Sequence, residues 1–126
     1  MNKKIINSKN APAPIGPYSQ AVLYNNTLYV SGQIAIDPAT GDLVTGDIVK
    51  ETHQVMKNIQ AILKEAGMDF SNVVKSGIFV KDLNNFGVIN QVYGEYYTNN
   101  PPARETVEVS RLPKDVNVEI SCIAIA

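Results

Sequence analysis

Apolar residues recur at steps of three and four between residues 48 and 66, and this spacing predicts an amphipathic helix. Asp47 can cap the start of the helix, and Gly67 can end it in the left-handed conformation. We expect the shared face to pack against the core. Its members are Ile48, Thr52, Val55, Met56, Ile59, Ile62, Leu63 and Ala66.

A second helix is predicted where apolar and aromatic residues again recur at helical spacing. Asn84 or Asn85 can cap its start, and the Pro101–Pro102 pair bars its continuation. We interpret its tyrosines as core residues rather than as a platform for stacking bases. The face consists of Phe86, Ile89, Val92, Tyr93, Tyr96 and Tyr97.

Strands are predicted on either side of the helices, over residues 18–24, 27–33, 73–81, 103–109 and 117–125. Asn25 and Asn26 tolerate positive φ, so the first two strands are expected to form a hairpin. The order ββαβαββ predicts one α+β domain over residues 1–126, with both helices packed on one face of a mixed sheet. The other face must then meet solvent or another subunit.

Composition narrows the class of protein. The chain has 126 residues, a formal net charge of −1, 44% apolar residues and 18% charged residues, which is typical of one folded domain. A near-neutral charge gives no general attraction to nucleic acid. No apolar stretch is long enough for a signal peptide or a membrane helix, and a single cysteine fits a reducing compartment. We therefore expect a cytoplasmic protein without nucleic-acid or membrane partners.

The sequence offers little for metal or cofactor chemistry. It contains neither common glycine-rich phosphate loop, and one cysteine and one histidine cannot form a thiolate or imidazole metal cluster. Cys122 lies in an apolar strand and is expected to be a buried, unreactive thiol. His53 is expected to be an ordinary, partly buried or surface residue of the first helix. We predict neither a metal ion nor a cofactor.

Alternation in the last two strands separates polar from apolar side chains. We expect the apolar side of each strand to face the core and the polar side to face away from it. In residues 103–109, Arg104, Thr106 and Glu108 oppose Val107 and Val109. In residues 117–125, Asn117, Glu119 and Ser121 oppose Val118, Ile120 and Cys122.

These polar faces have two interpretations. The first is a sheet face wetted by solvent, with Arg104 and Glu119 as ordinary surface charges. The second is a site in which the arginine binds a substrate carboxylate through two hydrogen bonds and the glutamate moves a proton through a water. Such a site would suit hydrolysis of a small carboxylate-bearing substrate. Spacing alone does not decide between them.

Several short runs, in order along the whole chain, resemble the RidA family, also called the YjgF/YER057c/UK114 family. They are Ile15-Gly16-Pro17-Tyr18-Ser19-Gln20, Ser31-Gly32-Gln33-Ile34, Pro102-Ala103-Arg104, Val107-Glu108-Val109, Leu112-Pro113-Lys114-Asp115 and Val118-Glu119-Ile120. The resemblance implies a chorismate mutase-like fold and a barrel-like homotrimer with pockets between subunits. It also implies cofactor-free deamination of small 2-imino acids such as 2-iminobutanoate and 2-iminopropanoate.

The resemblance assigns roles residue by residue. Arg104 would hold the substrate carboxylate, and Glu119 would position and activate water. Tyr18 and Asn90 would line the pocket, while Ser31 and Gly32 would belong to a loop that closes over the ligand. The remaining substrate-binding positions are Glu105 and Thr106, the latter through its backbone.

Three residues depart from what close relatives often carry. Thr106 stands in place of a cysteine, Glu105 in place of a smaller residue, and Ser121 in place of a second carboxylate. Alternation points the Glu105 side chain away from Arg104, so we expect it not to compete with substrate. The resemblance also places another strand between residues 103–109 and 117–125, although consecutive strands would otherwise be paired as a hairpin.

A second class of function fits the same resemblance. The protein could be a small-molecule-binding or regulatory trimer, with a translation-inhibiting or chaperone-like role, that uses the same pocket without turnover. The presence of both Arg104 and Glu119 favours the enzyme.

Overall fold

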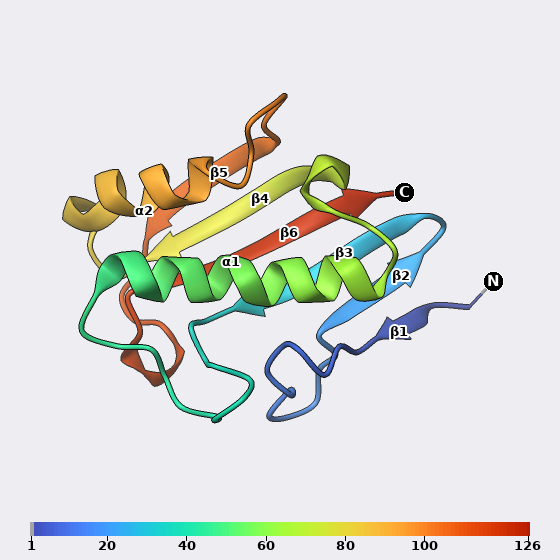
Figure 1. Cartoon of the computed structure of the whole chain (residues 1–126), viewed down its shortest axis with the longest axis horizontal. Coiled ribbons are helices and arrows are strands. Elements are labelled where there is room, and N and C mark those ends of the chain that lie inside the picture. The colour runs from blue at the N-terminus through green and yellow to red at the C-terminus, as the bar shows by residue number, and fades with distance from the viewer. Residues whose placement is uncertain (1) are drawn as a thin grey trace.

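A six-stranded mixed sheet carries two helices on one face (Figure 1). The structure is a computed structural model and describes residues 2–126. Helices α1 (Ile48–Glu65) and α2 (Phe86–Gly94) lie side by side on that face. This arrangement confirms the predicted α+β class. The strands are β1 (Lys4–Ile6), β2 (Ala21–Tyr24), β3 (Thr27–Gln33), β4 (Val73–Val80), β5 (Ala103–Glu108) and β6 (Val118–Ile125).

The strand order across the sheet is β1-β2-β3-β6-β4-β5. β4 and β5 are parallel and every other neighbouring pair is antiparallel. The parallel pair requires a crossover, which α2 supplies between the two strands. β4 therefore separates β5 from β6, as the resemblance implies, and the last two strands form no hairpin.

Local turn and cap signals place several boundaries correctly. Asn25 and Asn26 have φ angles of 49° and 67° and form the two-residue turn between β2 and β3. The Asp47 carboxylate accepts hydrogen bonds from the amides of Val49 and Lys50 at the start of α1. Gly67 has a φ of 74° just after the helix ends.

Other boundaries differ from the prediction. β1 was not expected, because three residues beginning at Lys4 carry no alternation signal. The strand expected from residue 18 begins at Ala21. The second helix ends at Gly94 and continues only as a hydrogen-bonded turn through Tyr97. Asn85 stands at the N-cap of α2, as predicted, but its side chain makes no capping hydrogen bond. The carboxylate of Asp82 instead caps the short 3-10 helix Leu83–Asn85 before α2, by accepting from the Asn84 amide.

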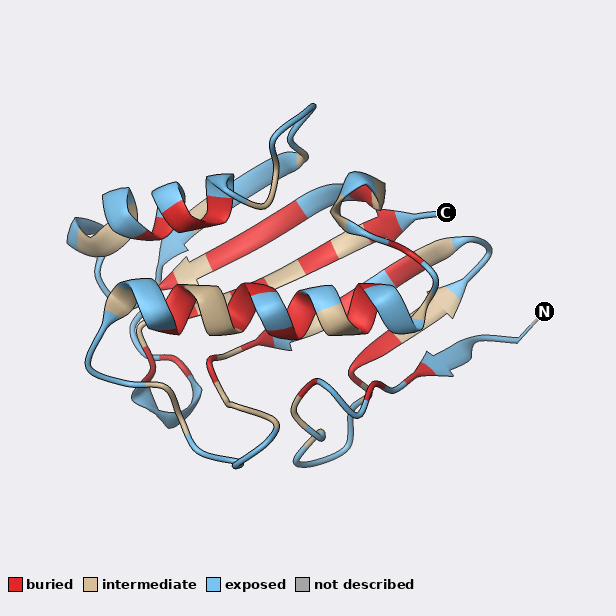
Figure 2. Ribbon diagram, in the orientation of Figure 1, coloured by how far each residue is buried: buried red, intermediate tan, exposed pale blue. Residues whose placement is uncertain are grey.

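The core lies between the helices and the sheet, and Figure 2 shows buried segments, in red, recurring along α1 and in the strands behind it. Val55, Met56 and Ile59 of α1 are fully buried, and Val118 and Ile120 of β6 meet them from the sheet. The three tyrosines join this layer, as predicted. Tyr93 is buried, and the half-buried rings of Tyr96 and Tyr97 pack against the core.

The edge strand β5 reverses the expected orientation. Its polar side faces α2, because Arg104 pairs in register with the fully buried Ser76 of β4 and contacts residues of that helix. Val107 points to the uncovered face instead and stays exposed. The expectation that the polar side faces away from the core is therefore wrong for β5 and correct for β6. Hydrogen-bond partners on the α2 side satisfy Arg104 and Glu108 of β5.

Candidate active site

A cavity of about 580 Å³ lies where the proline-rich segment 12–20, the end of β3 and the turn before β6 converge. Four residues assigned by the resemblance line it, namely Tyr18, Ser31, Gly32 and Glu119. Ser31 and Gly32 belong to strand β3, where its pairing with β6 is irregular, and not to a loop as expected. The cavity walls combine apolar side chains with a few polar groups, which is the usual composition of a small-molecule site.

Gln20 holds the proline-rich wall in place. Its side chain is 2% exposed, and its amide oxygen accepts from the Ser8 amide at 2.6 Å. Its amide nitrogen donates to the carbonyls of Ser8, Ala11 and Pro12 at 3.0, 3.3 and 3.0 Å. The neighbouring Ser31 hydroxyl donates to the Ser19 carbonyl at 2.6 Å. One buried amide thus fixes a segment that has no regular secondary structure of its own.

Glu119 presents a carboxylate to this cavity from the face of β6 that the helices do not cover. Gly32 lies so close to it that a Cβ at position 32 would be 2.7 Å from the glutamate Cδ and Oε2. Burial raises the pKa of Glu119, and no hydrogen bond or charge within residues 2–126 offsets that effect. The carboxylate is therefore available to a ligand and suited to proton transfer.

Arg104 lies in a separate cluster between β5 and α2. Its Nη1 donates to Asn90 Oδ1 at 2.6 Å. Its guanidinium carbon lies 5.2 Å from the ring centre of Phe86 and 5.3 Å from that of Tyr93. Residues 86, 90 and 93 share one helical face, so α2 holds the arginine through three side chains. Asn90 occupies one donor and leaves further guanidinium donors for a carboxylate.

The two clusters do not meet within one chain. Arg104 lies on the helix-covered face and Glu119 on the opposite face, with β4 between their strands. Arg104 is in register, through Ser76, with Cys122, which is three residues from Glu119. Strand spacing and rise then put the two backbones about 14 Å apart. One chain alone cannot place both groups on one small substrate.

The two residues after the arginine point to opposite faces. The Glu105 carboxylate forms an exposed ion pair with Lys75 at 3.2 Å on the uncovered face, so its side chain points away from Arg104 as alternation predicts. Thr106 shares the face of Arg104, and its hydroxyl is buried without a hydrogen-bond partner within residues 2–126. Neither side chain lines the cavity around Glu119.

Sequence reasoning assigned no role to several residues in the cavity wall. Most of them lie inside the short sequence runs that resemble the RidA family, and membership of those runs could have indicated them. Only the fold brings the runs together. The polar and apolar wall residues without an expected role include Gln20, Gln33, Ile34, Ile36, Pro113 and Lys114.

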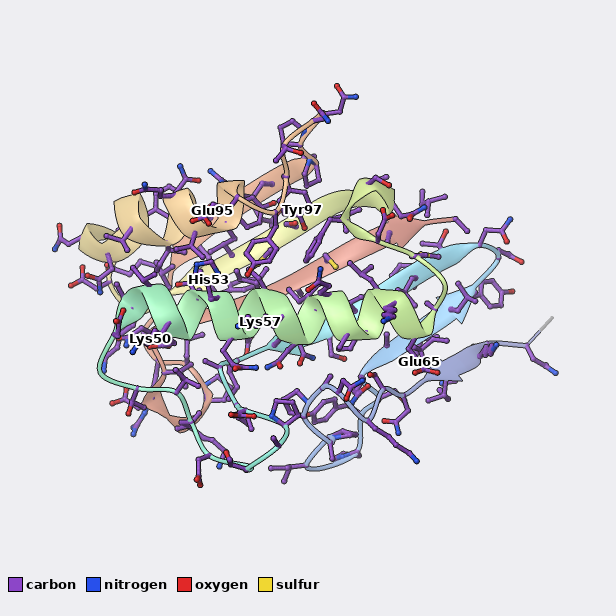
Figure 3. All side chains as sticks on the ribbon, in the orientation of Figure 1. Lys50, His53, Lys57, Glu65, Glu95 and Tyr97 are labelled. Carbon is purple, nitrogen blue, oxygen red and sulfur yellow. The ribbon has the colours of Figure 1, made fainter. Side chains whose placement is uncertain are left out.

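The single histidine and cysteine behave as expected. His53 is half-buried on the side of α1 nearest α2 and contacts the Tyr96 hydroxyl through Nδ1 at 2.7 Å, whereas Lys50, Lys57 and Glu65 of the same helix are exposed (Figure 3). Cys122 is 3% exposed, and burial raises its pKa to about 12. Residues 2–126 contain no cluster of three or more possible metal ligands. Within the same range, no helix is long and apolar enough to cross a membrane.

The chain is similar to known proteins over nearly its whole length. A sequence model of the family described as Endoribonuclease L-PSP matches residues 8–126. The RutC family protein PH0854 of Pyrococcus horikoshii is 53% identical over 97% of this chain and 97% of its own. The 2-iminobutanoate/2-iminopropanoate deaminase of Rattus norvegicus is 49% identical over 98% of this chain and 90% of its own.

A solved structure shows the same fold. The Rid family protein YyfA of Yersinia pestis superposes with a TM-score of 0.97 at 52% identity, covering 99% of this chain and 100% of that one. The two sequences are thus about half identical over nearly their full length. This chain also has the Arg104 and Glu119 clusters described above. The chain therefore belongs to the Endoribonuclease L-PSP family, the RidA/YjgF family of proteins.

Proposed function

We propose that this protein hydrolyses reactive 2-imino acids, such as 2-iminobutanoate and 2-iminopropanoate, to 2-oxo acids and ammonia without a cofactor. Two observations support the proposal. Arg104 is held by α2 and keeps donors free for a carboxylate. Glu119 lies in a cavity, and its carboxylate has no partner within residues 2–126. The names of relatives such as the rat deaminase support the same activity. Removal of such intermediates would take place in the cytoplasm.

The site would form between the subunits of a homotrimer. Arg104 and Glu119 lie on opposite faces of one sheet, so a second copy must supply one of them if both contact the same molecule. The uncovered sheet face provides a surface for that copy, since Tyr29, Val107 and Ile125 are exposed there. In a cyclic trimer, each cavity around Glu119 would receive Arg104 from one neighbour.

The reaction then needs only positioning and proton transfer. Arg104 binds the substrate carboxylate and fixes the imine carbon near Glu119. The glutamate accepts a proton from a water molecule while the water oxygen bonds to the imine carbon. The glutamate then gives this proton to the imine nitrogen. The hydroxyl proton of the resulting carbinolamine then moves to nitrogen as the C=O bond forms and the C–N bond breaks, which releases the 2-oxo acid and ammonia. Because burial raises the pKa of Glu119, its carboxylate is a stronger base than an exposed glutamate.

The direct test measures 2-oxo acid formation from imines generated in situ by threonine dehydratase, with semicarbazide competing for the imine. Wild type should reduce semicarbazone formation, and Arg104→Ala should lose nearly all of that effect because no neighbouring residue replaces the guanidinium fork. Glu119→Gln should keep ligand binding and lose rate. Residual activity of Arg104→Ala near that of wild type would refute the assignment, provided that both proteins have the same oligomeric state.

Mixing the two inactive variants tests the shared site. In trimers formed from equal amounts of Arg104→Ala and Glu119→Gln subunits, every mixed trimer holds one site with both groups intact. Random assembly would make roughly three of four trimers mixed, so about a quarter of wild-type activity should return. No recovery, with mixed trimers verified by mass spectrometry, would place both groups in the same subunit or outside the site.

The same experiments distinguish the deaminase from a protein that only binds small molecules. A protein that binds 2-oxobutanoate in an Arg104-dependent way, yet leaves semicarbazone formation unchanged, would be a small-molecule-binding or regulatory trimer. The family name, Endoribonuclease L-PSP, also suggests cleavage of RNA. A net charge of −1 gives that activity no general electrostatic support, and RNA cleavage by wild type would be measured in parallel.

A further inference from the structure

The turn from Leu112 to Asn117 is held in an unfavourable backbone conformation. Lys114 and Asp115 have φ angles of 56° and 55°, in the left-handed region that residues other than glycine adopt at a cost. Lysine is not among the residue types that favour this region. The turn nevertheless contributes Pro113 and Lys114 to the wall of the cavity that contains Glu119. Contacts outside the turn must therefore offset its conformational cost.

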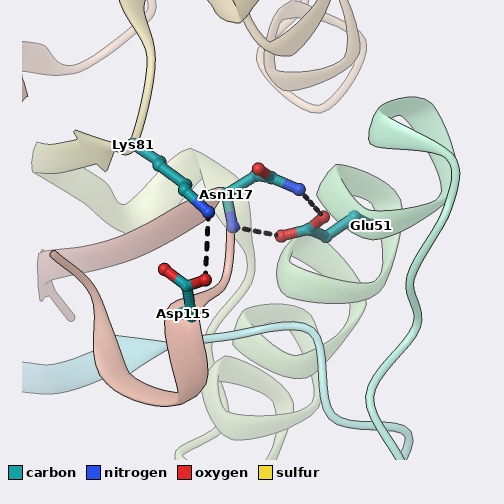
Figure 4. Close-up of polar contacts among 4 residues, drawn as sticks. All are labelled: Glu51, Lys81, Asp115 and Asn117. Atoms are coloured by element: carbon teal, nitrogen blue, oxygen red, sulfur yellow. Dashed lines mark hydrogen bonds and ion pairs between the residues drawn. The ribbon is translucent and has the colours of Figure 1, made fainter.

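Glu51 supplies the buried contact. It lies near the start of α1, is 2% exposed, and does not line the cavity. Its Oε2 accepts from the Asn117 amide at 2.8 Å, and its Oε1 accepts from Asn117 Nδ2 at 2.8 Å (Figure 4). Bonds to a buried carboxylate are charge-assisted, and removing the acceptor would leave a donor unsatisfied.

The other contacts of the turn are weaker. Lys81 pairs with Asp115 at 3.1 Å, as Figure 4 also shows, but both side chains are largely exposed, and such pairs contribute little. The Lys81 amide donates to the Asn117 carbonyl at 3.0 Å. Asn117 therefore stands at the junction of three segments, held by Glu51 from the helix and by Lys81 from the end of β4.

We infer that Glu51 is a positioning residue of the active site, acting through Asn117. By fixing the end of the turn it keeps Pro113 and Lys114 in the cavity wall. It also sets the start of β6, where Glu119 follows Asn117 by two residues. This inference rests on the proposed function, because its effect is on the site where the imine would be hydrolysed.

Glu51→Gln tests the inference with little change in volume. The substitution removes the negative charge, so the bonds to Asn117 lose their charge assistance whichever way the Asn117 amide turns. We expect kcat/KM for imine hydrolysis to fall about tenfold in folded protein, because two charge-assisted bonds become weaker neutral ones. The matched control is Thr52→Val, which removes the hydrogen bond from the buried Thr52 to the Ile48 carbonyl in the same part of α1. Its kcat/KM should stay within about twofold of wild type even if its melting temperature falls.

A second substitution distinguishes positioning from general stability. Glycine adopts positive φ without steric cost, so Asp115→Gly relieves the turn without changing a cavity residue. The substitution also removes the exposed ion pair with Lys81, which contributes little. Added to Glu51→Gln, it should restore most of the lost kcat/KM. Added to Thr52→Val, it should leave kcat/KM unchanged. A wild-type kcat/KM in Glu51→Gln, or an equal loss in Thr52→Val, would overturn the inference.

Amide hydrogen exchange separates this inference from the proposed function. If wild type hydrolyses no imine, the proposed function fails, but the contact can still be measured. The Asn117 amide should exchange at least about tenfold faster in Glu51→Gln than in wild type or Thr52→Val, while amides in the middle of β6 stay unchanged. Equal exchange at Asn117 in all three proteins would refute the role of Glu51 directly.

Discussion

Replacing Gly32 with alanine tests the close approach of β3 to Glu119. The new methyl carbon would lie 2.7 Å from the glutamate Cδ and Oε2 and 3.0 Å from its Cγ. Non-bonded carbon atoms normally pack at about 3.5–4.0 Å, so the carboxylate must move by about 1 Å. The atoms in the way belong to the free end of a side chain rather than to backbone, and the displacement therefore falls on the proposed catalytic group.

The structure predicts a small change in stability and a large change in rate. Gly32 does not have a positive φ, so alanine is allowed there and should stabilise the fold by about 0.4–1 kcal/mol through the unfolded state. Moving Glu119 from its rotamer costs about 0.5–1.5 kcal/mol, which nearly cancels that gain. A displacement of about 1 Å at a reacting group can nevertheless reduce the rate about 100-fold.

The assay is kcat/KM for imine hydrolysis, measured together with the free energy of unfolding in urea. The control is Gly87→Ala on α2, where nothing lies within 4 Å of the added Cβ. Alanine in a helix should stabilise that protein by about 1 kcal/mol and leave its rate unchanged. Wild-type kcat/KM in Gly32→Ala would refute the role assigned to the Glu119 position. A loss of several kcal/mol in stability would show that the backbone, not the carboxylate, absorbs the contact.

Three further predictions use stability and reactivity. Because burial raises the pKa of Glu119, its ionisation destabilises the fold; Glu119→Gln should have the higher melting temperature at pH 7, and the difference should vanish as the pH falls below the ordinary value of 4.5. An equal difference at pH 7 and pH 3.5 would contradict this. Gln20→Leu should lose about 3 kcal/mol in urea unfolding, since four hydrogen bonds of this buried side chain depend on it, and a loss below about 1 kcal/mol would contradict its role. Cys122 should resist iodoacetamide at pH 8 in the folded protein and react once unfolded, as its pKa of about 12 and its burial imply; rapid labelling in buffer would show access that the structure lacks.

Much of the local structure could be predicted from the sequence. Helical spacing, Asp47 and Gly67 define α1, and the two asparagines define the β2–β3 turn, because these signals depend on residues close together in the chain. The unexpected β1 shows the limit of this reasoning. A three-residue strand forms only because β2 offers it a partner, so its own residues carry no signal.

The candidate site depended more strongly on tertiary structure. Alternation correctly groups Arg104 with Thr106 and separates it from Glu105, since successive side chains in a strand point to opposite faces. It cannot say which face a helix will cover. On β5 the polar side met α2, where Asn90 and the rings of Phe86 and Tyr93 hold the arginine.

The sequence by itself therefore picked out Arg104 and Glu119 as the candidate residues, and the tertiary structure decided where they lie. The parallel pairing of β5 with β4 inserts a strand between Arg104 and Glu119, and the position of α2 puts these residues on opposite faces. Both facts depend on contacts between segments distant in the chain, which local spacing does not encode. The physical consequence is that the two charges, close in sequence, must come from different copies of the chain to act on one small molecule.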